Sequence, residues 1–239
     1  MQHKYFAVLA GLLLTASAAQ AQVTFGPRVG LNLSNVAIDT DDANVDTDTQ
    51  ARPGAQLGVA VNVPMGKFAL QPALVFSQKG FAAKEKSSGG YISTVESKVR
   101  TNYLEVPLNL VYTSGGDKGF QVLAGPYVGF GLSGKVSAKG TWSYRDAFIN
   151  DSGVVDETHD VKFVNKYPTR NPGDHAFFRS LDAGLNVGVG GKINAFQVQL
   201  VYGMGLANII PDEPVGQDSD DKVRNRGFQL TAGYFFSGN

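Results

Sequence analysis

The sequence contains no cysteine, so disulfide bonds cannot hold this chain together. It also lacks a basic excess, because 21 lysine and arginine residues are balanced by 21 aspartate and glutamate residues. After Leu14 there is no apolar run of the roughly 20 residues that a membrane-spanning helix requires. These absences exclude a disulfide scaffold and a helical membrane protein, and they argue against nucleic acid as a partner.

The first residues have the pattern of a secretory signal. Lys4 precedes an apolar run from Tyr5 to Leu14, and Ala19-Gln20-Ala21 fits the small-x-small rule for cleavage. We therefore expect residues 1–21 to be a signal peptide and residues 22–239 to form the mature protein as one domain. Removal of Lys4 leaves 20 basic against 21 acidic residues, a net charge near −1.

Strict alternation of apolar residues with polar residues or glycine is the dominant pattern of the mature chain. In the stretch from Leu181 to Lys192, apolar side chains occupy the odd positions and glycine, asparagine or aspartate the even ones. Side chains of a β-strand point to opposite faces with a period of two, so this stretch is predicted to be a strand with one apolar face. Seven further stretches alternate in the same way: 25–34, 52–63, 68–77, 103–112, 120–132, 196–205 and 227–236.

The connections between these eight stretches alternate in length. Three are the short turns "PMGK", "SGGDKG" and "KINA", whereas the other four are long loops at 37–50, 82–98, 135–176 and 208–223. Short turns on one side and long loops on the other are typical of barrels in the bacterial outer membrane, where the turns are periplasmic and the loops extracellular. An even number of strands then predicts that both termini are periplasmic.

The composition of the two faces indicates which one is inside. If the apolar face were buried, the outer surface would consist mainly of glycine and amide residues, with far less charge than a soluble barrel carries. If the apolar face meets lipid, the aromatic residues at both ends of the strands form the two expected girdles. We therefore predict an all-β, eight-stranded antiparallel up-and-down transmembrane β-barrel.

Several segments resemble the PorT-like family of small outer-membrane β-barrel proteins from Gram-negative bacteria. They are "FGPRVGLNLSNV", "LQPALVFSQKG", "YLEVPLNLVY", "AGPYVGFGLSGK" and "FQLTAGYFF". The most specific of them is "YLEVPLNLVY", Tyr103 to Tyr112, because of the placement of its Glu-x-Pro. The resemblance covers essentially the whole mature chain and implies insertion into the cell outer membrane. It also implies that the barrel-assembly machinery reads the last strand by its aromatic end at Phe236, although "SGN" follows that residue.

The predicted lumen is narrow, because eight strands leave an interior just wide enough for side chains to fill. Arg28, Glu105 and Asp182 carry charges on the inward parity, and buried charges are normally paired. We interpret them as an internal polar network that plugs the barrel. A narrow path for ions or very small solutes is the alternative.

Candidates for catalysis or metal binding are few. The mature chain has only His159 and His175, which lack metal-ligand spacing, although His175 with Ser180 or Asp174 could form a base and nucleophile at the rim. The loops at 37–50 and 208–223 are acidic but do not fit the EF-hand pattern, so we interpret them as solvated. Weak bridging by Ca²⁺ or Mg²⁺ to lipopolysaccharide is the alternative. We predict neither enzymatic activity nor a cofactor.

The predicted interactions lie on the loop side. Arg179, Arg224 and Arg226 have the outward parity just beyond the upper aromatic girdle, where guanidinium groups can pair with lipid phosphate or merely snorkel. The loop 135–176 is predicted to contain a hairpin of Val136–Tyr144 and Val161–Tyr167, whose aromatic residues contact either an extracellular partner or their own neighbours. The predicted role is structural or interaction-based, with outer membrane lipids and lipopolysaccharide as further partners.

Overall fold

A computed structural model describes residues 22–39, 48–87, 91–145, 150–168, 173–212 and 222–237. The predicted signal peptide and the central parts of the two acidic loops lie outside these residues. The described residues form eleven strands: β1 (Thr24–Asp39), β2 (Asp48–Met65), β3 (Phe68–Ser87), β4 (Tyr91–Thr113), β5 (Lys118–Arg145), β6 (Asn150–Val164), β7 (His175–Arg179), β8 (Leu181–Ile193), β9 (Phe196–Gly205), β10 (Lys222–Tyr234) and β11 (Phe236–Ser237). Within the described part of the chain, no helix combines the length and hydropathy needed to cross a bilayer.

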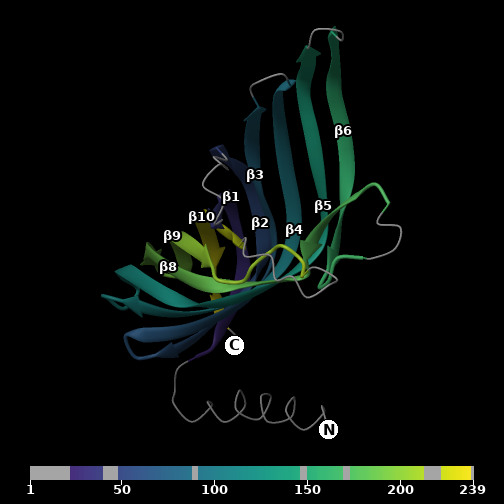
Figure 1. Ribbon diagram of the computed structural model, residues 1–239. Coiled ribbons are helices and arrows are strands. Elements are labelled where there is room, and N and C mark those ends of the chain that lie inside the picture. Colours follow the sequence, from purple (N-terminus) through teal and green to yellow (C-terminus); the bar gives the residue numbers. More distant parts are fainter. Residues whose placement is uncertain are drawn as a thin grey trace, which may run out of the picture.

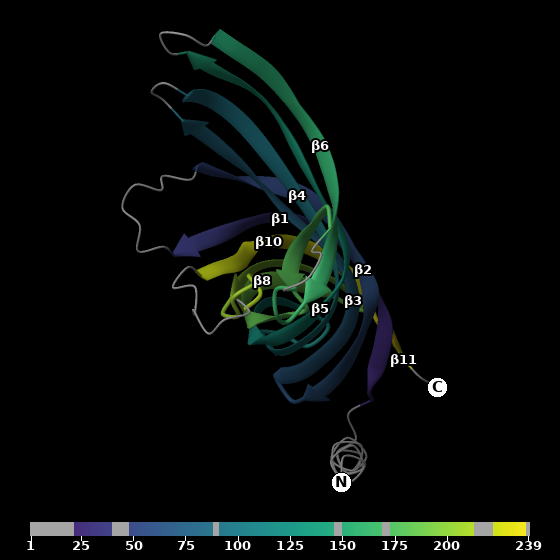
Figure 2. The ribbon, with the colours of Figure 1, turned by 45° about the vertical axis from the view of Figure 1, so that its right-hand side comes forward.

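Eight of the strands form a closed antiparallel ring (Figures 1 and 2). Its order is β4-β3-β2-β1-β10-β9-β8-β5, and the pairing of β4 with β5 closes it. The short β11 follows β10 and pairs with the start of β1, where Phe25 lies opposite Phe236. Each of the eight predicted strands coincides with one strand of the ring, so the predicted eight-stranded antiparallel barrel is confirmed.

The two faces of the ring differ as the alternation predicts. On the outer face Leu31 and Leu57 are 65% and 61% exposed, whereas the inward Gln121, Asn109 and Asp182 are at most 1% exposed. A soluble protein would bury the leucines and expose the amides and carboxylates. The barrel therefore presents an apolar exterior to its surroundings and encloses a polar interior.

Strands β4, β5 and β6 continue beyond the ring on the side of the long loops (Figures 1 and 2). We call residues 91–102 of β4, 133–145 of β5 and 150–160 of β6 the loop-side wall. Within it β4 pairs with β5 up to Tyr91 opposite Tyr144, and β5 pairs with β6 up to Arg145 opposite Asn150. The wall thus continues β4 and β5 of the barrel, and the end of β3 pairs along β4 as far as Ser87 opposite Ser93.

The predicted hairpin exists, but its second strand differs from the prediction. The sequence predicts Val161–Tyr167 as the returning strand of the hairpin, whereas the partner of β5 is β6, which begins at Asn150. The end of β6 pairs in parallel with β7, and Ser180 separates β7 from β8. The polar sequence of residues 150–160 shows no strand alternation, and it forms a strand because the extended β5 offers it a free edge.

A bulge on β5 marks the boundary between ring and wall. Tyr103 lies opposite Gly131 but Asn102 lies opposite Ser133, so Leu132 is an extra residue on β5. One extra residue reverses which side chains face outward beyond it. Below the bulge β5 turns its apolar residues outward, and above it Lys135 and its alternate neighbours face outward instead.

Candidate functional site

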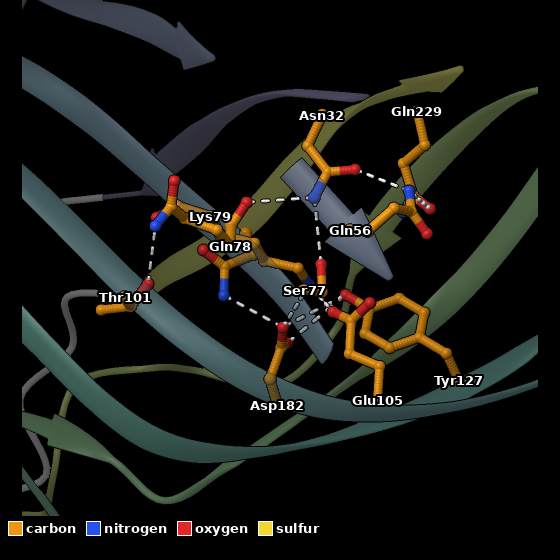
Figure 3. Close-up of polar contacts among 11 residues, drawn as sticks. Asn32, Gln56, Ser77, Gln78, Lys79, Thr101, Glu105, Tyr127, Asp182 and Gln229 are labelled. Atoms are coloured by element: carbon orange, nitrogen blue, oxygen red, sulfur yellow. Dashed lines mark hydrogen bonds and ion pairs between the residues drawn. The ribbon is translucent and has the colours of Figure 1, made fainter. Parts of the chain in front are cut away.

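A buried ion-pair cluster lies in the lumen near its loop-side end (Figure 3). The ammonium of Lys79, on β3, lies 2.5 Å from Oε1 of Glu105 on β4 and 2.9 Å from Oδ2 of Asp182 on β8. All three side chains are buried. Three strands of the ring are therefore joined through one cation.

Neutral groups complete this cluster. The side-chain amide of Asn225 donates a hydrogen bond of 3.0 Å to Asp182, and the Tyr127 hydroxyl donates to both oxygens of the same carboxylate at 3.4 Å. The Lys79 ammonium also lies 4.7 Å from the ring centroid of Tyr127 and 5.4 Å from that of Tyr103, within cation–π range. Such contacts offset the cost of removing the three charges from water.

A layer of amides lies beside the cluster and spans β1, β2, β3 and β10 (Figure 3). The Asn32 amide donates to the Ser77 hydroxyl at 3.1 Å and to the Gln78 carbonyl at 3.0 Å. The Gln56 amide donates to Asn32 at 2.7 Å and to Gln229 at 3.2 Å. These bonds fill the middle of the lumen with groups that satisfy one another.

The turn-side part of the lumen is filled by further amides and a small apolar core. Gln71 and Gln197 exchange hydrogen bonds of 3.2 and 3.3 Å across the barrel. Val111, Leu123 and Val201 pack together there and are almost completely buried. Side chains thus occupy the lumen along its length.

The structure separates Arg28 from the two predicted carboxylates. Glu105 and Asp182 share Lys79, whereas Arg28 is buried nearer the turns, and among the described residues no carboxylate forms an ion pair with it. Lys79 and Asn225 were missing from the predicted network. The alternation of inward and outward residues could have revealed both. Each lies on the inward parity of its strand, two residues outside the predicted stretch: Lys79 after 68–77 and Asn225 before 227–236.

Two small spaces lie between these layers. One cavity, beside Lys79 and Tyr127, and another, beside Arg28 and Gln71, each have a volume of about 10 Å³. That is room for about one water molecule. A vestibule of about 570 Å³ at the turn-side end reaches inward as far as Gln121.

The loop-side end of the lumen is covered. The ring of Phe163, on β6, packs edge-on against Tyr103 with their centroids 5.6 Å apart. Gly131 lies beneath Phe163, and a Cβ atom built on it would come within 2.1 Å of that ring. The backbone of β7 is joined to residues 206–212 by a hydrogen bond from the Arg179 amide to the carbonyl of Ile209, a buried residue.

Two of the three predicted lipid-binding arginines have acidic partners. The Arg179 guanidinium forms an ion pair with Asp212, and Arg224 lies 3.8 Å from Asp39. Arg226 is exposed on the outward face. Contact of these residues with lipid phosphate stays a prediction.

Both histidines of the mature chain lie above the ring. His159 Nδ1 lies 2.7 Å from Asp174, and Nε2 lies 3.2 Å from Glu157. The hydrogen bond with Glu157, followed by the charge of Asp174, raises the pKa of His159 above its usual 6.5. The His175 ring packs against Phe177, and the described residues contain no group of three potential histidine, cysteine or acidic metal ligands.

Comparison with known proteins gives one family and several solved structures. Residues 18–211 match the family model described as outer membrane protein beta-barrel domain. The chain is similar to Ail, the attachment invasion locus protein of Yersinia pestis, crystallised in complex with the heparin analogue sucrose octasulfate, with 14% identity over 90% of this chain and 99% of that chain and a TM-score of 0.37. It is also similar to the outer membrane protein OprG from Pseudomonas aeruginosa, with 8% identity over 91% and 97% of the two chains and a TM-score of 0.36. No curated protein sequence matches the chain.

Proposed function

The chain belongs to the outer membrane protein beta-barrel domain family, and from that premise we propose that it is a closed barrel which acts through its loop-side wall. Its role is structural or interaction-based, without catalysis and without a cofactor. The PorT-like subgroup is part of this proposal and rests on the sequence segments that resemble it.

The filling of the lumen is the observation that carries the proposal. The cluster of Lys79, Glu105 and Asp182 lies between the Phe163 lid and the layer of amides. The two cavities between these layers have room for about one water each, which is too little for a continuous water path. Because the lumen is filled in this way, the outer and loop-side surfaces of the barrel are left to carry the function.

The same proposal includes export and orientation. Residues 1–21 are removed as a signal peptide, and residues 22–239 insert with both termini in the periplasm and the long loops outside. The barrel-assembly machinery reads the aromatic end at Phe236, which pairs with Phe25 of the first strand. Lipids and lipopolysaccharide of the outer membrane surround the apolar face.

The loop-side wall, together with the rest of loop 135–176, is the proposed contact surface for an extracellular partner. Trp142 lies opposite Gly153, so the absence of a side chain on β6 makes room for the indole ring. Val154 on β6 is 77% exposed. Exposed apolar residues on a sheet are suited to protein contacts, because aromatic and apolar groups dominate the centres of interfaces.

A narrow passive channel is the second candidate, favoured by the turn-side vestibule of about 570 Å³. Conductance of the refolded mature chain in a planar bilayer distinguishes the two functions, after a heat-dependent gel shift has verified folding. We expect no current. A steady current that changes in Glu105→Gln or Asp182→Asn would support the channel and refute the closed barrel.

A further inference from the structure

A basic cavity of about 610 Å³ lies on the outward face just above the bulge of β5. Its charged lining comes from β2, β4, β5 and β6. It contains five cations and a single carboxylate: Arg52, Lys98, Arg100, Lys135, Lys139 and Asp160. None of these residues belongs to the arginine set that the sequence pattern suggested for lipid contact.

Strand register brings the cations of β4 and β5 onto one face. Arg100 lies directly opposite Lys135, and Lys98 lies opposite Ser137 in the next outward pair. Directly opposed residues in antiparallel strands project to the same side with their Cβ atoms about 5 Å apart. The bulge at Leu132 is what turns Lys135 outward, so the cluster depends on that extra residue.

The positive charges are only partly compensated. Lys98, Lys135 and Lys139 lie 3.2, 4.0 and 3.0 Å from Glu96, Asp160 and Asp156, respectively. Exposed pairs of this kind contribute little. Within the described residues neither Arg52 nor Arg100 forms an ion pair, so five cations face three carboxylates.

The cavity adjoins the apolar belt of the barrel. Leu132 lines it and is 53% exposed, while Leu104 and Phe130 lie opposite each other one step below, on the same outward face. A ligand that fits both parts is an amphiphile whose phosphate contacts the cations and whose acyl chains contact the leucines and phenylalanine. Guanidinium groups suit this role because they bind phosphate bidentately.

We propose that this cavity binds a phosphate group of lipopolysaccharide in the outer leaflet. The inference rests on the proposed orientation, in which the long loops face outward. It locates the lipid contact on β4 and β5 rather than at Arg179 and Arg224, whose guanidinium groups have acidic partners.

The test compares two triple variants with the same loss of charge. The cavity variant is Arg52→Gln/Arg100→Gln/Lys135→Gln, and the control is Arg179→Gln/Arg224→Gln/Arg226→Gln. Binding of purified lipopolysaccharide and of its dephosphorylated form to the refolded full mature chain is measured in detergent. We expect the cavity variant to bind lipopolysaccharide at least about tenfold more weakly, since even one lost charge-assisted hydrogen bond has this effect. The control should bind as the parent does, and dephosphorylation should weaken binding to the parent but not to the cavity variant.

Three results would overturn the proposal. They are unchanged lipopolysaccharide binding in the cavity variant, equal weakening of that binding in both variants, and full competition by inorganic phosphate at the same concentration as the lipopolysaccharide. If the triple variant fails to fold, Lys135→Glu replaces it, because that side chain is 72% exposed and its loss leaves no buried group unpaired.

Failure of the orientation is detected separately. The chain has no cysteine, so Val154→Cys provides a single site for a membrane-impermeant maleimide on intact cells. If Val154→Cys is labelled but the cavity variant binds lipopolysaccharide as the parent does, the lipid site is refuted and the proposed function stands. Absence of labelling in cells that hold the folded barrel would refute the orientation, and with it both proposals.

Discussion

Lys79 and Asp182 form an ion pair of 2.9 Å across the lumen, between strands β3 and β8, which are not neighbours in the ring. Backbone pairing alone fixes each strand only against its two neighbours. The Lys79 contact adds a link across the barrel, and Asn225 connects the same carboxylate to β10. A charge network of this kind selects the arrangement of strands in which every member has a partner.

Replacement of Lys79 tests this link. Lys79→Met keeps much of the side-chain volume but leaves Glu105 and Asp182 buried without their cation. We expect the free energy of unfolding in lipid vesicles, measured by urea titration, to fall by about 3–5 kcal/mol.

The matched control is Lys139→Met, which removes a lysine from the exposed pair with Asp156. It should lower the free energy of unfolding by less than about 1 kcal/mol. Equal effects of the two substitutions would show that the buried cluster has no special role in stability.

Gly131 provides a test of the lid over the lumen. A Cβ atom at this position would lie 2.1 Å from the Phe163 ring, so Gly131→Val should push the ring away from Tyr103. We expect faster proteolysis within residues 135–176 and a loss of about 1–3 kcal/mol in the free energy of unfolding, the usual cost of overpacking. Gly116→Ala is the control, because its added Cβ atom meets nothing within 4 Å. If Gly131→Val resists proteolysis as well as the parent does, the idea that Phe163 covers the lumen is contradicted.

The strand pattern of the barrel could be predicted from sequence because lipid and lumen impose opposite demands on alternate residues. The same rule reaches Lys79 and Asn225, whose inward parity continues past the apolar part of β3 and β10. Pairing partners within the lumen could not be predicted, since parity gives a face but not a distance across the barrel. Parity alone therefore places Arg28 in one group with Glu105 and Asp182, whereas the cation that pairs with both carboxylates is Lys79.

The loop-side wall was less predictable for a different reason. Above the bulge both faces of a strand meet water or other loops, so β6 has no alternation by which to recognise it. The cavity around Arg100 and Lys135 also depends on the bulge, because one extra residue decides whether Lys135 faces outward. Such a bulge leaves no clear signal in a single sequence.

His159 gives the wall a measurable pH response. Because its pKa is raised in the folded state, the stabilisation from its contacts is fully present below the unfolded value of 6.5 and is lost as the pH rises through the folded pKa. We expect an NMR titration of the imidazole to give a pKa above 6.5. Glu157→Gln should lower it more than Asp174→Asn does, because the Glu157 hydrogen bond is the larger cause. His175→Gln assigns the resonance, and titration of the parent at or below 6.5 would contradict these contacts.

Shortening the loop-side wall separates barrel assembly from surface function. Ala138 lies opposite Glu157, so an Asn-Gly turn can replace residues 139–156 and join the two strands as a tight hairpin. This deletion keeps Phe163 over Tyr103. We expect the heat-dependent gel shift and the closed state in planar bilayers to be unchanged.

A longer deletion, of residues 139–164, also removes Phe163 and is the informative comparison. It uncovers Tyr103 and removes the strand that pairs with β7, so the barrel should unfold at a lower urea concentration while its lumen stays blocked by the Lys79 cluster. Current through the longer deletion alone would mean that Phe163, rather than the charged cluster, closes the barrel. Loss of folding in the shorter deletion would mean that the wall is part of the barrel's stability and not a separate surface.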